Sequence, residues 1–195
     1  MTVFRDILSR FKDPRALFGF LRKETESFKP LKGHLTIKGY ENGRLVVSYS
    51  HSNIIVNSAS VLISRLLKDS GEPTAGISYL AVGTGDIGWN LQDPPAPTTS
   101  ATTHTGETER KVIGINDTNF VDPDTGDPIL SATNVVDYSV TFNESEAVGP
   151  LVEMGLFGGD ATAATNTGTM INWRTFPVIN KTNSMTLTII FRITA

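Results

Sequence analysis

The feature that most constrains the fold is a strict alternation of apolar and polar residues close to the C-terminus. From Met185 to Ile193 every second residue is apolar, and three of the four residues between them are Thr or Arg. Successive side chains of a β-strand point to opposite faces, so this period of two predicts a strand with one face in the core and the other mostly in water. Strands of that kind are typical of antiparallel sheets.

Two further alternating runs, residues 35–40 and 45–50, are joined through Asn42-Gly43. Both positions of a two-residue hairpin turn require positive φ, which Asn and Gly adopt more readily than other residues. The spacing therefore predicts a β-hairpin. Another alternating run at residues 135–142 predicts one more antiparallel strand.

One helix is expected inside the β region, at residues 58–68. Asn57-Ser58 provides a helix cap, and the apolar residues that follow form one stripe of Val61, Leu62, Leu66 and Leu67. Together these elements predict a mainly β protein. Its expected architecture is an antiparallel β-sandwich over residues 32–195 with one packed helix and an N-terminal helical arm.

The arm, residues 1–31, has a pattern of its own. Apolar side chains recur there at helical spacing, and Asp13-Pro14 begins a second short helix. Helices this short are marginal alone in water, so they need a surface to pack on. They either cover the sheet of their own chain, dock on a neighbouring subunit, or lie on a membrane surface. We interpret the segment as a docking arm with the interface residues Phe4, Ile7, Leu8, Phe11 and Phe20.

The charge is distributed unevenly along the chain. The net charge is −3, yet the segment 1–33 carries eight basic and four acidic side chains, a balance of +4. The segment 34–195 carries nine basic and sixteen acidic side chains, a balance of −7. The two ends therefore meet different neighbours, or the arm of one subunit lies on the body of another. Because nucleic acid is negatively charged, the acidic segment 34–195 is not expected to form a broad nucleic-acid interface.

The sequence contains no recognisable constellation for catalysis or metal binding. The 195 residues include no cysteine, and the three histidines lack metal-ligand spacing. Residues 83–88 match G-x-G-x-x-G, but prolines at 94 and 95 oppose the helix that a nucleotide site needs, so a glycine turn is expected. No enzyme activity, cofactor or small-molecule substrate is predicted. Asp122, Asp124 and Asp127 either bind a cation or form a solvated hairpin tip.

Neither a signal peptide nor a membrane helix is expected. Charged residues interrupt the first twenty positions, and no later stretch approaches the roughly 18 apolar residues of a membrane span. The stretches at residues 94–108 and 161–167 consist mainly of small and polar residues. We expect both to be exposed loops that are poorly anchored to the body.

Several short segments carry a resemblance to a known family. They are Glu-Met-Gly-Leu-Phe at 153–157, a Gly-led strand at 168–174, an extended stretch at 176–182 and Ile-Ser-Tyr-Leu-Ala-Val-Gly-Thr-Gly at 77–85. Their order, completed by the final alternating strand, resembles the attachment domains of tail fibres of tailed bacteriophages and related virion structural proteins.

This resemblance implies a virion protein of the tail, baseplate or neck that is assembled in the host cytoplasm. It would act as an adaptor or fibre-attachment module, and its partners would be copies of itself in a homo-oligomer and other virion structural proteins. Neither nucleic acid nor membrane is an expected partner. The alternative is a small carbohydrate-binding β-sandwich in which Trp89, Trp173 or Tyr79 stacks on a sugar.

The segment around Glu153 is expected to contribute to the interface between subunits. In a strand, Glu153 shares a face with Gly155 and Phe157, opposite a face that Val152 and Met154 would place in the core. We therefore expect Glu153 and Phe157 at an interface. Arg174 or Lys181 is expected to provide the opposite charge for Glu153.

Overall fold

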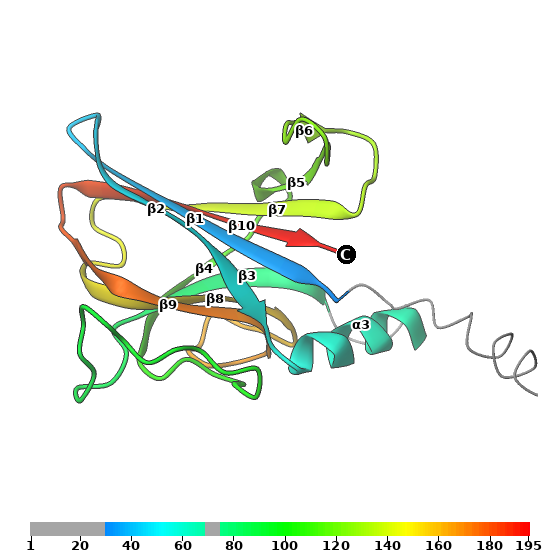
Figure 1. Cartoon of the computed structure of the whole chain (residues 1–195), viewed down its shortest axis with the longest axis horizontal. Coiled ribbons are helices and arrows are strands. Elements are labelled where there is room, and N and C mark those ends of the chain that lie inside the picture. Colours follow the sequence, from blue (N-terminus) through cyan, green and yellow to red (C-terminus); the bar gives the residue numbers. More distant parts are fainter. Residues whose placement is uncertain (1–29, 69–74) are drawn as a thin grey trace, which may run out of the picture. The chain divides into compact units, whose positions relative to one another are not determined.

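The computed structural model describes residues 30–68 and 75–195. The chain divides into two compact units, Met1–Pro30 and Leu31–Ala195, and only the second can be described. The arm residues Phe4, Ile7, Leu8, Phe11 and Phe20 lie outside the described residues. The described body is mainly β, with one ten-stranded antiparallel sheet and one short α-helix (Figure 1).

The order of the strands in the sheet differs from their order in the chain. Across the sheet the order is β4-β3-β8-β9-β2-β1-β10-β7-β5-β6. Along the chain the elements are β1 (Lys32–Glu41), β2 (Arg44–Ile55), α3 (Ser58–Lys68), β3 (Ala75–Gly83), β4 (Glu107–Val112), the 3-10 turn η1 (Ile115–Asp117), β5 (Thr118–Val121), β6 (Pro128–Ile129), β7 (Val135–Phe142), β8 (Gly149–Gly159), β9 (Thr169–Lys181) and β10 (Met185–Thr194).

The local patterns at both ends of the described body are confirmed. Asn42 and Gly43 have φ values of 49° and 75°, as the tight turn between β1 and β2 requires. In β10, the residues at alternate positions from Met185 to Phe191 are buried, whereas the residues between them are partly exposed. This strand lies between β1 and β7, so its apolar face is part of the centre of the core.

β2 connects two parts of the sheet. Its residues up to Asn53 pair with β1, and its last two residues, Ile54 and Ile55, pair with Trp173 and Asn172 of β9. Figure 1 shows β1, β2, β7 and β10 in one layer and β3, β8 and β9 in a second layer. Apolar side chains from both groups of strands form one core cluster, to which β1 contributes Leu35 and Ile37, β3 Leu80, β8 Leu156 and β10 Phe191. Burial of this shared apolar surface is the main force that holds the two groups together.

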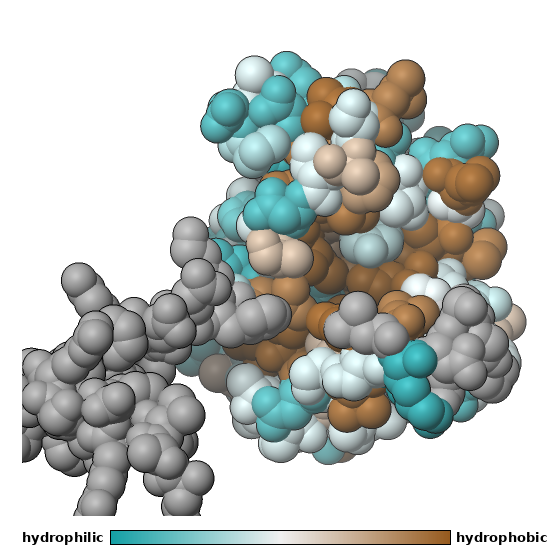
Figure 2. All heavy atoms as spheres, turned by 90° about the vertical axis from the view of Figure 1, so that its right-hand side faces the viewer, coloured by the Kyte–Doolittle hydropathy of each residue, from teal (hydrophilic) through white to brown (hydrophobic). Residues whose placement is uncertain are grey.

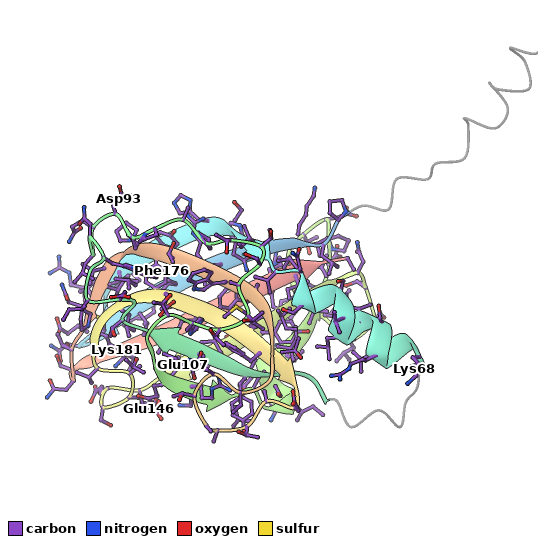
Figure 3. The ribbon with its side chains drawn as sticks, turned by 90° about the horizontal axis from the view of Figure 1, so that it is seen from below. Lys68, Asp93, Glu107, Glu146, Phe176 and Lys181 are labelled. Carbon is purple, nitrogen blue, oxygen red and sulfur yellow. The ribbon has the colours of Figure 1, made fainter. Side chains whose placement is uncertain are left out.

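β8 differs from β10 because it is buried on both faces. Every residue from Leu151 to Gly159 is buried, so the strand shows no alternation of exposure. A second apolar cluster, which includes Phe157 and Trp173, lies against Trp89, Ala101 and Ala161. Those three residues belong to the connections 84–106 and 160–168, and Figure 3 shows the first of these, with Asp93, crossing the sheet. The two loops expected to be poorly anchored therefore cover the outer face of β8 and β9.

Candidate functional site

Glu153 lies beneath the connection 84–106. Its side chain has 0% exposure. Its Oε1 accepts a hydrogen bond of 2.6 Å from the backbone N–H of Gly106, and its Oε2 accepts bonds of 3.1 Å from the N–H of Thr105 and from Nε1 of Trp173. The expected interface position of Glu153 is corrected here, because the covering loop closes the face of β8 on which this carboxylate lies.

The two cations expected to pair with Glu153 have other partners. Arg174 donates from Nε to the hydroxyl of Tyr49 at 3.1 Å. Lys181 is buried, and its Nζ donates to the backbone carbonyls of Asn143 and Met185, each at 2.7 Å. Burial lowers the pKa of Lys181. Lys181 therefore fixes two turns of the body rather than neutralising Glu153.

Phe157, the second residue expected at an interface, is fully buried as well. Its ring lies edge-on to the imidazole of His104, with ring centroids 5.3 Å apart, and the Arg110 guanidinium lies 4.7 Å from its centroid. Burial and, secondly, the charge of Arg110 lower the pKa of His104 to about 3. The neutral imidazole therefore forms part of the packing around Phe157, which offers no surface to a neighbour.

An ion pair anchors the second covering loop. Nε of Arg110 and Oε1 of Glu107 are 2.5 Å apart, and both side chains are almost completely buried. Nη1 of Arg110 donates to the carbonyls of Thr162 at 2.9 Å and Thr167 at 3.0 Å, and Glu107 accepts from the N–H of Asn166 at 2.9 Å. The expectation of a poorly anchored 161–167 loop is therefore wrong. Nothing in its composition of small and polar residues predicted these partners, which come from β4.

The three aromatic residues considered for sugar stacking do not form a common exposed surface. Trp173 is only 8% exposed and belongs to the second apolar cluster, against which Tyr79 and Trp89 pack. Trp89 lies directly over Gly85, which has a φ of 67° and where a Cβ would collide with the indole. The aromatic rings therefore fix the covering loop to the sheet.

The other two motifs serve as turns. Residues 84–90 contain no helix, so the glycines at 83–88 form a turn, as expected. Asp122 accepts hydrogen bonds through Oδ1 from the N–H groups of Asp124 and Thr125, at 2.8 and 3.3 Å, inside the tip between β5 and β6. Among residues 30–68 and 75–195, no group of three or more His, Asp or Glu side chains is placed to hold a metal ion.

A mostly apolar opening lies at the end of the body where the described chain begins. We call it the entry groove: it has a volume of about 270 Å³ and includes Leu31, Leu62, Leu66, Ile77, Tyr138 and Ile193 in its lining. Figure 2 shows apolar side chains gathered in a hollow on this side of the molecule. The predicted stripe on α3 is only partly buried: Leu62 is in the core, whereas Val61 and Leu66 are exposed.

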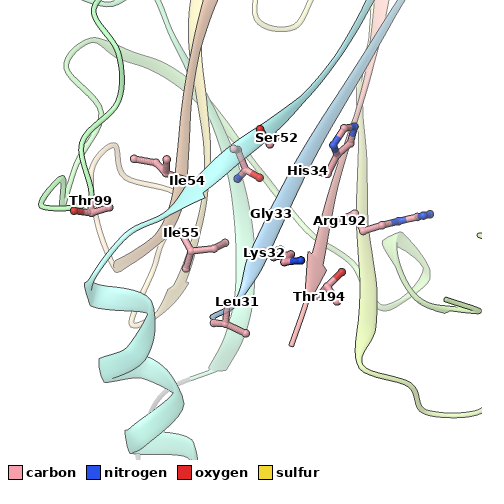
Figure 4. A pocket seen from close by; sticks show the side chains of 11 residues that line it. Leu31, Lys32, Gly33, His34, Ser52, Ile54, Ile55, Thr99, Arg192 and Thr194 are labelled. Atoms are coloured by element: carbon pink, nitrogen blue, oxygen red, sulfur yellow. The ribbon is translucent and has the colours of Figure 1, made fainter. Parts of the chain in front are cut away.

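A second hollow, of about 510 Å³, adjoins the entry groove at Leu31 (Figure 4). Lys32, His34 and Arg192 contribute basic side chains to its lining. Asn53 lies in it as well, and neither polar atom of its buried amide has a hydrogen-bond partner among the described residues. This end of the body thus combines exposed apolar surface with an unsatisfied amide.

No helix in the part of the chain that the structure describes has the length and apolar character needed to cross a bilayer. A comparison with protein-family models found none that matches the chain. A comparison with curated proteins likewise found no significant match.

Proposed function

We propose that this chain is a structural protein of a bacteriophage virion. It belongs to the tail, baseplate or neck and acts as an adaptor or fibre-attachment module through assembly into a homo-oligomer. Its partners are copies of itself and other virion structural proteins, and assembly takes place in the host cytoplasm. In this role it carries out no catalytic turnover and needs no cofactor, nucleic acid or membrane. The two layers of the body are proposed to be a β-sandwich.

The observation that carries this proposal is the entry groove. Ile63 and Leu66 of α3 are 40% and 46% exposed beside a groove that is mostly apolar. A contiguous apolar surface of this kind marks a site of contact with another protein more often than an accidental exposure. The resemblance of residues 77–85 and 153–182 to fibre-attachment domains points in the same direction.

The carbohydrate-binding alternative receives less support. It requires an exposed aromatic ring, yet Trp173 is buried and donates its indole N–H to Glu153. Tyr79 is only partly exposed and has Arg110 at 5.7 Å from its ring centroid. A sugar that stacked on either ring would have to displace contacts that hold the covering loops.

The proposal is tested by measuring the mass of the full chain in solution, by light scattering and sedimentation across a wide range of concentrations. We expect a defined oligomer that dissociates on dilution. A monomer of 21.1 kDa at every concentration would overturn the proposal. A monomer that binds sugars on a glycan array would support the carbohydrate-binding alternative instead.

A further inference from the structure

We propose that the entry groove receives the apolar face of residues 3–21 from a second copy of this chain. This inference rests on the proposed function and names the contact through which copies assemble. It commits to one occupant, the N-terminal arm of a neighbour. Other occupants of the groove are distinguished by the experiment below.

The groove has the chemistry and the size to take side chains from such an arm. Its lining is mostly apolar, with Leu62, Ile77 and Ile193 among its residues. A cavity of about 150 Å³ is large enough for benzene, so 270 Å³ accommodates about two aromatic side chains. Leu66 extends the apolar surface beyond the groove, along the exposed side of α3. This combination of a helix edge and an apolar groove is a common receptor for an amphipathic helix.

The arm has the matching sequence. Phe4, Ile7, Leu8 and Phe11 are spaced as i, i+3, i+4 and i+7, which places them on one face of a helix. Residues 1–28 include five phenylalanines, whereas the groove offers only aliphatic residues and one tyrosine as its large apolar side chains. The arm therefore provides aromatic side chains, and the groove provides a mostly aliphatic surface on which they can pack.

Charge favours the arm as the occupant, and a second copy is chosen because the proposed function requires copies of this chain to associate. The segment 1–33 carries +4 and the rest of the chain −7, so an arm is attracted to the body of any copy. Leu31 itself lines the groove, so each copy extends its arm from the rim of the site that it offers. Donation to the next copy uses every arm and every groove once, and it produces either a reciprocal dimer or a head-to-tail ring.

The absence of cysteine allows a direct test by cross-linking. One full-length chain carries Phe11→Cys and another carries Leu66→Cys. The two are mixed, mildly oxidised and separated without reductant. We expect a disulfide-linked heterodimer. The matched control replaces Leu66→Cys with Val46→Cys, a similarly exposed apolar position in β2, and should give at least ten-fold less product.

A chain that carries both Phe11→Cys and Leu66→Cys completes the test. Covalent dimers and larger species support the proposal. A link that forms only within one copy, with no heterodimer in the mixture, overturns it in favour of an arm that covers its own body. If the full chain is an oligomer but neither design cross-links to Leu66, the inference fails and the proposed function stands. If the full chain is a monomer and no link forms, both fail.

A charge placed in the groove provides a second readout. Leu66 is 46% exposed, so Leu66→Asp leaves the core intact. We expect the variant to lose the oligomer in the mass measurement while its circular dichroism spectrum stays that of the parent chain. An unchanged oligomer in the Leu66→Asp variant overturns the proposed position of the contact.

Discussion

The indole Nε1 of Trp173 donates a hydrogen bond of 3.1 Å to Oε2 of Glu153, and both side chains are buried. The same carboxylate accepts from two backbone N–H groups of the covering loop. Glu153 therefore links β8, β9 and the connection 84–106 at one buried point. Among the described residues, three N–H groups donate to its two oxygens.

The first prediction is that Glu153→Ala unfolds more easily by about 3 kcal/mol or more. Each donor left unpaired in a buried site costs roughly 1–3 kcal/mol. The substitution leaves the backbone N–H groups of Thr105 and Gly106 and the indole N–H of Trp173 without their acceptor. Urea denaturation measures the change. The exposed Glu144→Ala is the control, and its effect should stay within about 0.5 kcal/mol. Equal effects of the two substitutions would show that Glu153 is not buried in solution.

The second prediction concerns acid. The folded-state pKa of His104 is about 3, below the 6.5 of the free side chain, so the unfolded chain binds a proton that the folded chain does not. Stability should therefore fall as the pH is lowered from 6.5 towards 3, by up to about 1.4 kcal/mol per pH unit from this residue. Above about pH 7.5, where the unfolded chain also leaves this imidazole unprotonated, His104 contributes almost no pH dependence.

Comparison with His104→Leu isolates this effect, because leucine is of similar size and does not titrate. The free energy of unfolding is measured by denaturation at several pH values between pH 7 and pH 4. It should change more with pH in the parent chain than in the variant. Identical slopes for the parent chain and His104→Leu would refute a buried neutral imidazole.

The third prediction is that Arg110→Met releases the 160–168 loop. Removal of the guanidinium takes away the bonds to the carbonyls of Thr162 and Thr167 and leaves Glu107 buried without its cation. Loss of one partner of a buried pair costs roughly 3–5 kcal/mol. Amide hydrogen exchange in the loop should accelerate by at least about ten-fold. Lys111→Met, which breaks the partly exposed pair with Glu146, should leave the loop protected.

The fourth prediction is that Lys181→Met destabilises the body by about 2–4 kcal/mol. The ammonium donates to the carbonyls of Asn143, Glu144 and Met185, and methionine fills similar space but leaves those carbonyls without this donor. Thermal unfolding measures the change against Lys38→Met, an exposed lysine on β1 that should be close to neutral. A Tm for Lys181→Met equal to that of the control would contradict the structure.

The parts of the fold that the sequence predicted are those that depend on local rules. Positive φ at Asn42 and Gly43 produces the β1–β2 hairpin without help from the rest of the chain. The alternation in β10 survives because one of its faces is buried in the core and the other stays partly exposed. The helix at Ser58–Lys68 follows equally from the helical spacing of its apolar residues.

The position of Glu153 was not predictable by those rules. The argument from alternation assumes that one face of the strand meets water, and β8 breaks this assumption because segments distant in the chain cover its outer face. These segments have few large apolar residues, so their composition resembles that of exposed loops. The hydrogen bonds that anchor them are accepted by Glu153 and Glu107 and donated by Arg110, and these partners depend on the tertiary fold.

The entry groove represents an intermediate case. The sequence indicated an apolar stripe on α3, and the structure leaves Val61 and Leu66 of that stripe exposed. Helical spacing shows which residues share a face but not whether the same chain covers that face. The same limit applies to Phe4 and Phe11 in the arm, and the position that the arm occupies in solution stays a prediction.

The pairing of β1 with β10 determines how the body responds to mechanical load. Lys32 pairs with Thr194, so the strands that lead to the two ends of the body terminate side by side. Tension between these ends peels β10 from β1 one residue pair at a time. Tension that enters at Lys32 and is resisted at the β1–β2 turn runs along β1 instead and loads its bonds to both β2 and β10 in shear. A tether attached before Lys32 is therefore held much more strongly against the far end of the body than against its own C-terminus.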